Sequence, residues 1–383
     1  MRILVVGTGY SQFVKEPIEK SLLSNNNEIF VTYNLDQSET FLEFYRNNDI
    51  KILDLHNKNT LVGKIPKLGV LYNFNRQVKS ICQKEKLDLI HIHSVNSYIL
   101  TSFIVNFLNR YTRRIVCTIY GSDILLKSSY KLKKWQKIFN KIDAISMATN
   151  NLIKKFKGVY GTKYDEKIFK LPFGLTNLEA IDAINDQSNC KRILGVNSEK
   201  VMISIGHNKC VEQQHLEVMD AFLKLPKDVL DKLTIVLQMT YGNGSREYVK
   251  EVKAKAQKLG CDLLIFEDYM DEKEIAVLVK ATDYYINSQK SDAMSGAMLE
   301  YLYADTIVLN PSWLDYDELK ENGCSFISYQ SFEEMKDIVK ELVEGKISLD
   351  ISHNYSIIKN MAHWEVNSQK WKKFLYFDSD CKE

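Results

Sequence analysis

Short apolar runs alternate with longer segments of helical periodicity along most of the chain, and this alternation is the first guide to its fold. In the first half the apolar runs are predicted strands, at residues 2–7, 28–33, 50–55, 87–93, 114–119 and 144–148. Segments with apolar residues three and four positions apart are predicted helices, at residues 16–23, 71–84 and 98–109. Strands separated by segments of helix length predict parallel βαβ units.

The same alternation begins again near residue 200. The predicted strands there are residues 200–206, 233–238, 262–266, 281–286 and 306–309, and the predicted helices are 212–224, 245–259, 271–280 and a segment beginning near Ser295. The sequence therefore predicts an α/β protein with two Rossmann-like, doubly wound domains that face a central cleft.

Pro172 and Gly174 mark the expected joint between the two domains, because only five prolines occur in the chain. We expect a first domain at residues 1–177 and a second at 178–353. The segment 354–383 has a helical pattern with two tryptophans, and we expect it to form a helix that packs back on the first domain.

Length and composition fit two soluble globular domains. The chain has 383 residues with 45% hydrophobic content, which is ample for two cores. Its seven cysteines have no CxxC spacing, which favours reduced thiols in a cytoplasmic protein and argues against a zinc site. No apolar run approaches the ~18–20 residues of a transmembrane helix. The chain opens directly on a predicted strand, so we expect no signal peptide.

The net charge of +2 hides a strong asymmetry between the two halves. Residues 1–177 carry 27 Lys and Arg against 14 Asp and Glu, a balance of +13, whereas residues 178–383 carry 24 against 35, a balance of −11. A basic half is compatible with a phosphorylated substrate or an anionic membrane, and basic loops also occur without such a partner.

Polar and glycine residues gather where the predicted strands end. These loops are residues 7–9, 91–93, 120–123, 206–209, 241–244 and 287–296. Ligands of doubly wound sheets bind beyond the carboxyl ends of the strands. The coincidence of six such loops is stronger evidence for a ligand site than any one motif. Gln12 stands where a third glycine would follow Gly7 and Gly9 in a dinucleotide fingerprint, which argues against a dehydrogenase.

The segment from Asn287 to Glu300 is the most informative of these loops. It predicts a strand end, a turn of small residues, and a helix that begins near Ser295 or Gly296. The free N–H groups of such a helix start suit a phosphate group. Asp292 and Glu300 lie eight residues apart, on either side of this start. An ordinary strand-to-helix turn, with Glu300 as a surface charge, is the alternative interpretation.

Five segments of the chain resemble the GT-B glycosyltransferases of family 4, and they occur in the same order. They are residues 87–93, 118–123, 170–174, 203–206 and 292–300. The resemblance covers most of the chain. It implies a nucleotide-sugar donor, no metal, and a pair of carboxylates in which Asp292 approaches the hydroxyls of the donor sugar and Glu300 approaches the ribose. The family usually has a glutamate where Asp292 stands.

Three further positions depart from the family pattern. Tyr120 stands where the family usually has histidine. His207 and Glu212 stand where it usually has the arginine and lysine that clamp the diphosphate, so that His207 or Lys209 is expected to replace the clamp. Short motifs, including residues 206–208 and 120–123, are also similar to the family 56 N-acetylfucosamine transferases, which have the GT-B fold.

The candidate catalytic residues are Asp292, Asp123 and His93. The candidate donor-binding residues are Gly7, Gly9, Tyr120, Gly206, His207, Asn208, Lys209, Tyr241, Gln289, Ser295, Gly296 and Glu300. Asp123 follows a predicted strand and is interpreted as a base or as a residue that orients the acceptor, with a helix N-cap as the alternative. His93 is interpreted either as a contact to sugar hydroxyls or as a structural residue at a strand end.

The expected function is transfer of a sugar from a nucleotide diphosphate to a glycan or a lipid-linked saccharide, as in bacterial surface polysaccharide synthesis, with retention of configuration. The donor is a co-substrate, with a UDP-sugar favoured over a TDP- or GDP-sugar, and no cofactor, metal or nucleic acid is expected. A catalytically idle GT-B relative that binds glycan or a partner enzyme, and a sugar-nucleotide 2-epimerase, remain as alternatives.

A lysine-rich stretch at residues 130–141 adds one candidate partner. On a helix, Leu132, Trp135, Ile138 and Phe139 would share a face flanked by lysines. This pattern is typical of a helix on an anionic membrane surface, and we therefore expect a cytoplasmic protein that can bind the inner face of the membrane. A helix whose apolar face packs in the core gives the same pattern.

Overall fold

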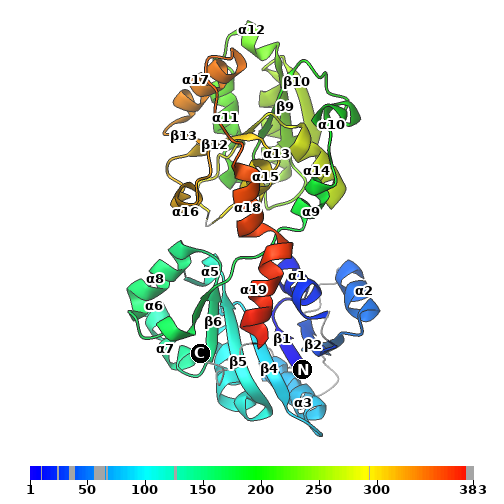
Figure 1. The fold of residues 1–383 in the computed structure, drawn as a ribbon, viewed down its shortest axis with the longest axis vertical. Coiled ribbons are helices and arrows are strands. Elements are labelled where there is room, and N and C mark those ends of the chain that lie inside the picture. Colours follow the sequence, from blue (N-terminus) through cyan, green and yellow to red (C-terminus); the bar gives the residue numbers. More distant parts are fainter. Residues whose placement is uncertain are drawn as a thin grey trace. The chain divides into compact units, whose positions relative to one another are not determined.

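The computed structural model describes residues 1–9, 11–23, 26–33, 39–55, 65, 68–124, 127–292 and 294–376. The chain divides into two compact units (Figure 1). The first unit comprises Met1–Phe173 and Trp364–Glu383, and the second comprises Gly174–His363. The proposal from the sequence places the divisions after residues 177 and 353 instead.

The first unit is built on a parallel sheet whose strands follow the order β3-β2-β1-β4-β5-β6-β7. The strands are β1 (Arg2–Val6), β2 (Glu28–Tyr33), β3 (Lys51–Asp54), β4 (Leu87–His93), β5 (Thr112–Ile119), β6 (Ala144–Met147) and β7 (Ile168–Lys170). β1 pairs with β2 on one side and with β4 on the other. The order reverses direction at β1 and β4, which places a switch point between them.

Helices cover the two faces of this sheet. They are α1 (Gln12–Ser21), α2 (Glu39–Asn47), α3 (Leu68–Ile81), α4 (Tyr98–Phe103), α5 (Gly121–Ile124), α6 (Ser129–Lys133), α7 (Gln136–Phe139), α8 (Asn150–Tyr160) and α19 (Trp364–Tyr376). α4 continues into the π-helical turn Ile104–Leu108 and the 3-10 turn Asn109–Tyr111. One apolar cluster packs α3, α4 and α8 on the sheet, and a second packs α1 and α19.

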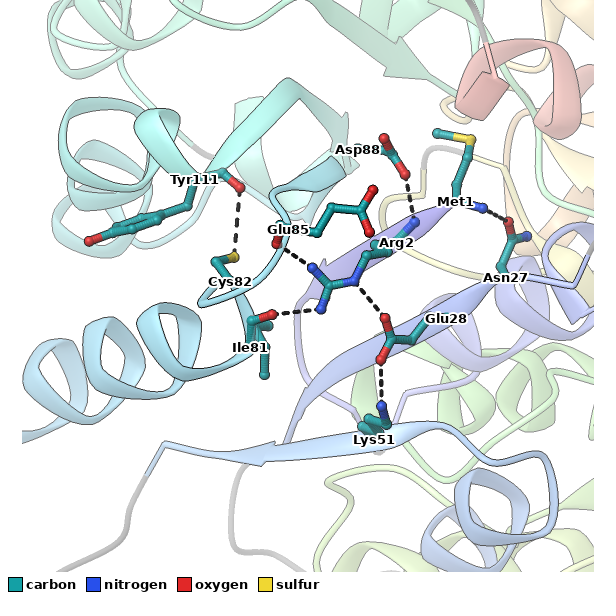
Figure 2. Close-up of polar contacts among 10 residues, drawn as sticks. All are labelled: Met1, Arg2, Asn27, Glu28, Lys51, Ile81, Cys82, Glu85, Asp88 and Tyr111. Carbon is teal, nitrogen blue, oxygen red and sulfur yellow. Dashed lines mark hydrogen bonds and ion pairs between the residues drawn. The ribbon is translucent and has the colours of Figure 1, made fainter.

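The amino-terminal edge of this sheet is held by the side chain of Arg2 (Figure 2). Its guanidinium donates to the Glu28 carboxylate at 2.6 Å and to the carbonyl of Ile81 at 2.6 Å. Its backbone N–H donates to the Asp88 carboxylate at 2.8 Å. Arg2 and Lys51 lower the pKa of Glu28. The guanidinium of Arg2 therefore ties β1 to β2 and to the end of α3, and its backbone N–H ties β1 to β4.

α19 completes the core of the first unit. Trp371 is fully buried, and its indole N–H donates to the Pro172 carbonyl at 3.0 Å. Its ring contacts the rings of Phe173 and His93, with centroids 5.0 Å and 6.3 Å away. The indole of Trp364 donates to the Glu16 carboxylate of α1 at 3.2 Å. The carboxyl-terminal segment is thus a structural part of the first unit.

The second unit is built on a parallel sheet with the order β10-β9-β8-β11-β12-β13. Its strands are β8 (Val201–Ile205), β9 (Leu233–Gln238), β10 (Asp262–Phe266), β11 (Tyr284–Ile286), β12 (Ile307–Pro311) and β13 (Ile327–Tyr329). The switch point lies between β8 and β11, since β9 and β12 lie on opposite sides of this central pair.

The helices of the second unit pack on both faces of its sheet. They are α9 (Asn177–Asp182), α10 (Gln187–Ile193), α11 (His215–Phe222), α12 (Lys227–Leu230), α13 (Arg246–Gln257), α14 (Glu272–Ala281), α15 (Gly296–Tyr303), α16 (Asp317–Glu321), α17 (Phe332–Val343) and α18 (Asn354–Ala362). α15 is fixed to the sheet by Tyr301, whose ring stacks on Tyr285 at 4.1 Å and whose hydroxyl donates to Ser204 at 2.8 Å.

The predicted α/β fold with two Rossmann-like sheets is confirmed. Each predicted strand is present, and the short strands β7 and β13 are additional. Residues 98–109 do not form one regular helix, because the segment changes to a π-helical turn at Ile104. Residues 354–376 form two helices, α18 in the second unit and α19 in the first.

For residues 130–141 the structure supports the second of the two interpretations, an apolar face that packs in the core. The segment forms two short helices, α6 and α7, and its apolar residues Leu132, Trp135, Ile138 and Phe139 are at most 5% exposed. They pack in the core of the first unit. Among the described residues, no helix combines the length and the apolar character that crossing a membrane requires.

We expect Trp371→Ala to destabilise the first unit by about 3–5 kcal/mol, because it removes a fully buried ring and leaves a cavity. Differential scanning calorimetry of the full chain checks this, because the transition in which the first unit unfolds should move to a lower melting temperature. Lys373→Ala, an exposed change on the same helix, is the control. Equal melting temperatures for the two variants would contradict the assigned role of α19.

Candidate active site

Three loops meet at the carboxyl edge of the second sheet, because β9, β8 and β11 are neighbours in it. The N–H of Gly206 after β8 donates to the Ile286 carbonyl of β11 at 3.1 Å, and the N–H of Lys209 donates to the Tyr241 carbonyl after β9 at 2.8 Å. The side chain of Gln214 donates to the Ser288 carbonyl at 2.6 Å. Hydrogen bonds thus join the loops that the sequence selected.

Gly206 is required by the turn after β8. Its φ is +62°, and a Cβ there would lie 2.8 Å from His215 Nε2 and 3.0 Å from Gln213 Oε1. His215 is fully buried, and its Nδ1 lies 3.0 Å from the Tyr248 hydroxyl. The backbone therefore passes directly over buried side chains, a close approach that only glycine permits.

His207 follows this glycine and carries a neutral ring. Its ring atom Nδ1 lies 3.4 Å from the hydroxyl of Tyr285, and its backbone N–H donates to Gln213 Oε1 at 3.3 Å. Burial lowers the pKa of His207 to about 4, and the nearby Asp292 carboxylate opposes this shift. The imidazole can donate or accept a hydrogen bond at neutral pH but brings no charge, so that Lys209 is the cation of this loop.

Asn208 and Tyr241 form the neighbouring wall. Asn208 is buried, its Oδ1 accepts the N–H of Cys210 at 2.8 Å, and its side chain is hydrogen bonded to Tyr241. Burial raises the pKa of Tyr241, and the charge of Glu300 adds to the rise. Glu300 is therefore close enough to Tyr241 to affect its ionisation. The half-exposed Tyr241 ring also faces that of His207, at 6.3 Å.

Asp292 is held by a buried tyrosine that sequence reasoning did not select. The Tyr316 hydroxyl donates to Asp292 Oδ2 at 2.8 Å and accepts the N–H of Ser295 at 3.2 Å. Tyr316 is 2% exposed. Burial and the Asp292 carboxylate raise the pKa of Tyr316, so its hydroxyl keeps its proton. Gln289 Nε2 lies 3.4 Å from the same Asp292 oxygen.

α15 begins beside this carboxylate. The Ser295 hydroxyl accepts the N–H of Met298 at 3.2 Å as the N-cap. Because the N–H of Ser295 is bonded to Tyr316, the first-turn donors available to a ligand are those of Gly296 and Ala297. A Cβ on Gly296 would meet only Leu175, at 3.5 Å. One turn further, Glu300 Oε1 accepts from Asn177 Nδ2 at 2.8 Å.

The remaining predicted residues, Gly7, Gly9, His93, Tyr120 and Asp123, belong to the first unit. The N–H of Gly7 donates to the Thr32 hydroxyl at 3.0 Å, and a Cβ at Gly7 would meet that of His93 at 3.0 Å. The carbonyl of Gly9 accepts the hydroxyl of Tyr45. Gly7 therefore permits a close approach to His93 at the end of β1, and donor binding by Gly7 and Gly9 stays a prediction.

His93 is 5% exposed, and its Nδ1 lies 2.8 Å from the Tyr120 hydroxyl. Burial lowers the pKa of His93 to about 3, so the ring is neutral. It stacks almost parallel to the ring of Trp371. In this arrangement His93 and Tyr120 form a packed pair at the ends of β4 and β5, and contact of His93 with a sugar stays a prediction.

Asp123 joins the loops after β4 and β5. It is 1% exposed and accepts hydrogen bonds from the Tyr120 N–H at 2.9 Å, the Ser94 hydroxyl at 2.7 Å and the Val95 N–H at 3.2 Å. Burial raises the pKa of Asp123, and these hydrogen bonds oppose the rise. Action as a base stays a prediction, and it requires the carboxylate to leave some of these partners.

Tyr316, Tyr285 and Asn177 support the site but were not selected from the sequence. Tyr316 lies 24 residues from the Asp292 that it contacts, and Asn177 lies 123 residues from Glu300. No local motif marks such contacts. Within the described ranges, no group of three or more His, Cys, Asp or Glu side chains is placed to hold a metal ion, and metal independence stays a prediction.

A family model described as glycosyl transferase 4-like matches residues 2–153. Several solved structures have the same fold over nearly the whole chain. HepE of Anabaena, solved with UDP and glucose, is 16% identical with a TM-score of 0.71, and the match covers 98% of this chain and 99% of that one. A glycosyltransferase of Rickettsia africae is 15% identical with a TM-score of 0.76 and the same coverage.

Sucrose-phosphate synthase of Thermosynechococcus elongatus is 11% identical with a TM-score of 0.67, over 97% of each chain. No curated protein matches the chain by sequence. These findings show that the chain has the two-sheet GT-B fold of these solved structures. The similarity in sequence to the glycosyl transferase 4-like family rests on residues 2–153.

Gly206→Ala should destabilise the second unit more than Gly345→Ala. Both glycines have positive φ, but the space around Gly345 is open whereas a Cβ at Gly206 meets His215 and Gln213. The shared backbone strain costs about 1–2 kcal/mol, and we expect overpacking to add about 1–3 kcal/mol at Gly206. Thermal unfolding of both variants measures the difference, and equal losses would refute the close packing beneath the loop.

Proposed function

We propose that this chain is a glycosyltransferase that transfers a sugar from a nucleotide-diphosphate donor, and that its second unit binds the donor. The observation that carries the proposal is the meeting of the Gly206–Lys209 loop, Tyr241 and the start of α15 at one edge of the sheet. Backbone N–H groups, a lysine and a helix start are the groups that bind a diphosphate without a metal. The bound UDP and UDP-glucose of HepE support a UDP-sugar as donor.

The proposed roles follow from the contacts. Asp292, held by Tyr316, accepts hydrogen bonds from the hydroxyls of the donor sugar, and Glu300 accepts those of the ribose. When the bond between the anomeric carbon and the diphosphate breaks, its electron pair passes to the departing oxygen. Lys209 and the N–H groups of Gly296 and Ala297 stabilise this negative charge. The acceptor hydroxyl forms the new bond to the anomeric carbon and passes its proton to an oxygen of the departing diphosphate.

The finer parts of the proposal concern the acceptor. We propose a glycan or a lipid-linked saccharide, as in bacterial surface polysaccharide synthesis, and transfer with retention of configuration. Family 4 resemblance supports both statements. Incubation with UDP-glucose and a panel of such acceptors tests them, with the anomeric configuration of the product read by NMR. Nucleotide binding without transfer to any acceptor would support the idle relative, and a changed sugar isomer would support an epimerase.

Asp292→Ala and Glu300→Ala should each lower the transfer rate by at least ~100-fold, the scale for losing a positioned polar group at developing charge. Glu251→Ala, an exposed acidic residue on α13, is the control and should retain the parental rate. Rates are measured with saturating donor after checking that each variant keeps its melting temperature. Full activity in both site variants would remove these residues from the mechanism.

Lys209→Met should weaken UDP-glucose binding by about tenfold, the value of one hydrogen bond to a charged group. Lys258→Met, exposed at the end of α13, is the control. Binding should not vary between pH 6 and 8 through His207, because its pKa of about 4 keeps it neutral there. Calorimetric titration measures both effects. Affinity that rises several-fold from pH 8 to pH 6, with Lys209→Met unchanged, would assign the clamp to His207 instead.

A further inference from the structure

Large hydrophobic side chains are exposed on two neighbouring segments of the first unit, residues 96–110 and 127–141. Ile99 is 52% exposed, Phe107 is 55% exposed and Tyr130 is 72% exposed. The segments are held side by side, since Lys127 Nζ donates to Asn96 at 2.8 Å and Lys141 Nζ donates to Asn106 at 2.6 Å. We call the exposed side chains of these two segments the docking face.

The first segment presents an apolar ridge to solvent. Ile99, Phe103 and Phe107 are spaced four residues apart, and the rings of Phe103 and Phe107 stack at 5.3 Å. The opposite side of the segment, which includes Ile104, Val105 and Leu108, is fully buried. The helix is π-helical over Ile104–Leu108, a local geometry that is rare and occurs frequently at functional sites.

Positive charge surrounds this ridge. The two segments contain no Asp or Glu, and their cations are Arg110, Lys127, Lys131, Lys133, Lys134, Lys137 and Lys141. Lys134 Nζ lies 5.0 Å from the centre of the Tyr130 ring, and Lys127 Nζ lies 5.5 Å from that of Trp135. Lys127 and Lys134 can therefore each pack the side-chain stem on an aromatic ring while the charge stays in water.

We infer that the docking face binds an anionic membrane surface. Lysines without acidic neighbours are attracted to the headgroups, and each one near the surface adds to binding. Tyr130 suits the headgroup level, and Ile99 and Phe107 suit the acyl boundary below it. The apolar ridge favours a lipid surface over a nucleic acid, because an aliphatic side chain such as Ile99 gains little from phosphates or base edges.

The docking face differs from the apolar stripe that the sequence indicated. The buried side of the second segment consists of Leu132, Trp135, Ile138 and Phe139, which pack in the core. The Trp135 ring contacts that of Tyr98 at 5.3 Å and so fixes the start of the first segment. The buried residues fix the two segments to each other and to the core, and the exposed residues make the inferred contact.

Flotation of the full chain with vesicles tests the inference. Vesicles of phosphatidylglycerol and phosphatidylcholine in equal parts should retain the protein at low salt, and pure phosphatidylcholine vesicles should not. Retention should fall as salt rises to about 300 mM, where charges are screened beyond several ångströms. Substituting Ile99→Ser, Phe107→Ser and Tyr130→Ser together should lower retention at least about tenfold, and so should Lys131→Glu with Lys134→Glu.

Matched changes in the second unit are the controls. Ile193→Ser, Leu223→Ser and Tyr269→Ser replace exposed residues of similar kind, and Lys250→Glu with Lys258→Glu repeats the charge change. Both controls should keep parental retention. Equal loss in docking-face and control variants, or binding to heparin or nucleic acid without binding to the anionic vesicles, would overturn the inference. Since no donor or acceptor is present, the outcome is independent of the proposed transferase activity.

Discussion

The pairing of β8 with β11 at the centre of the second sheet is the constraint on which the candidate site depends. It places the N–H of Gly206 on the Ile286 carbonyl, and so sets two loops from distant parts of the chain side by side. Gly206 completes the pairing with a positive φ over His215. From there the contacts continue through Tyr285 to His207 and through Tyr316 to Asp292 and the start of α15. A larger side chain at position 206, or a change in the register of β11, would displace both the loop after β8 and the start of α15.

Burial decides the charges of this edge. His207 and His215 have lowered pKa values because they lie away from water, so neutral rings line the loops and the positive charge comes from lysine and backbone dipoles. Tyr316 keeps its proton for the same reason and donates to Asp292. A preorganised set of neutral donors around one carboxylate and one lysine suits a reaction in which negative charge develops on a leaving diphosphate.

Much of this arrangement could be predicted from the sequence. The strand ends at Gly206 and Ile286 are marked by apolar runs that stop at glycine or polar residues, and parallel topology requires their loops to share an edge. Tyr316 and Asn177 could not be found this way, because only tertiary packing brings them to Asp292 and Glu300. The apolar stripe with Trp135 and Phe139 could not be assigned from the sequence, because an amphipathic pattern is the same for a core-facing helix and a membrane-facing one.

A crystal structure of the chain with UDP-glucose is the most direct test of the account. We expect the diphosphate to lie within hydrogen-bonding distance of the Gly296 N–H and of Lys209, with the sugar hydroxyls at Asp292 and the ribose at Glu300. A nucleotide bound to the first unit, or one bound to the second unit away from the loop after β8 and the start of α15, would contradict it.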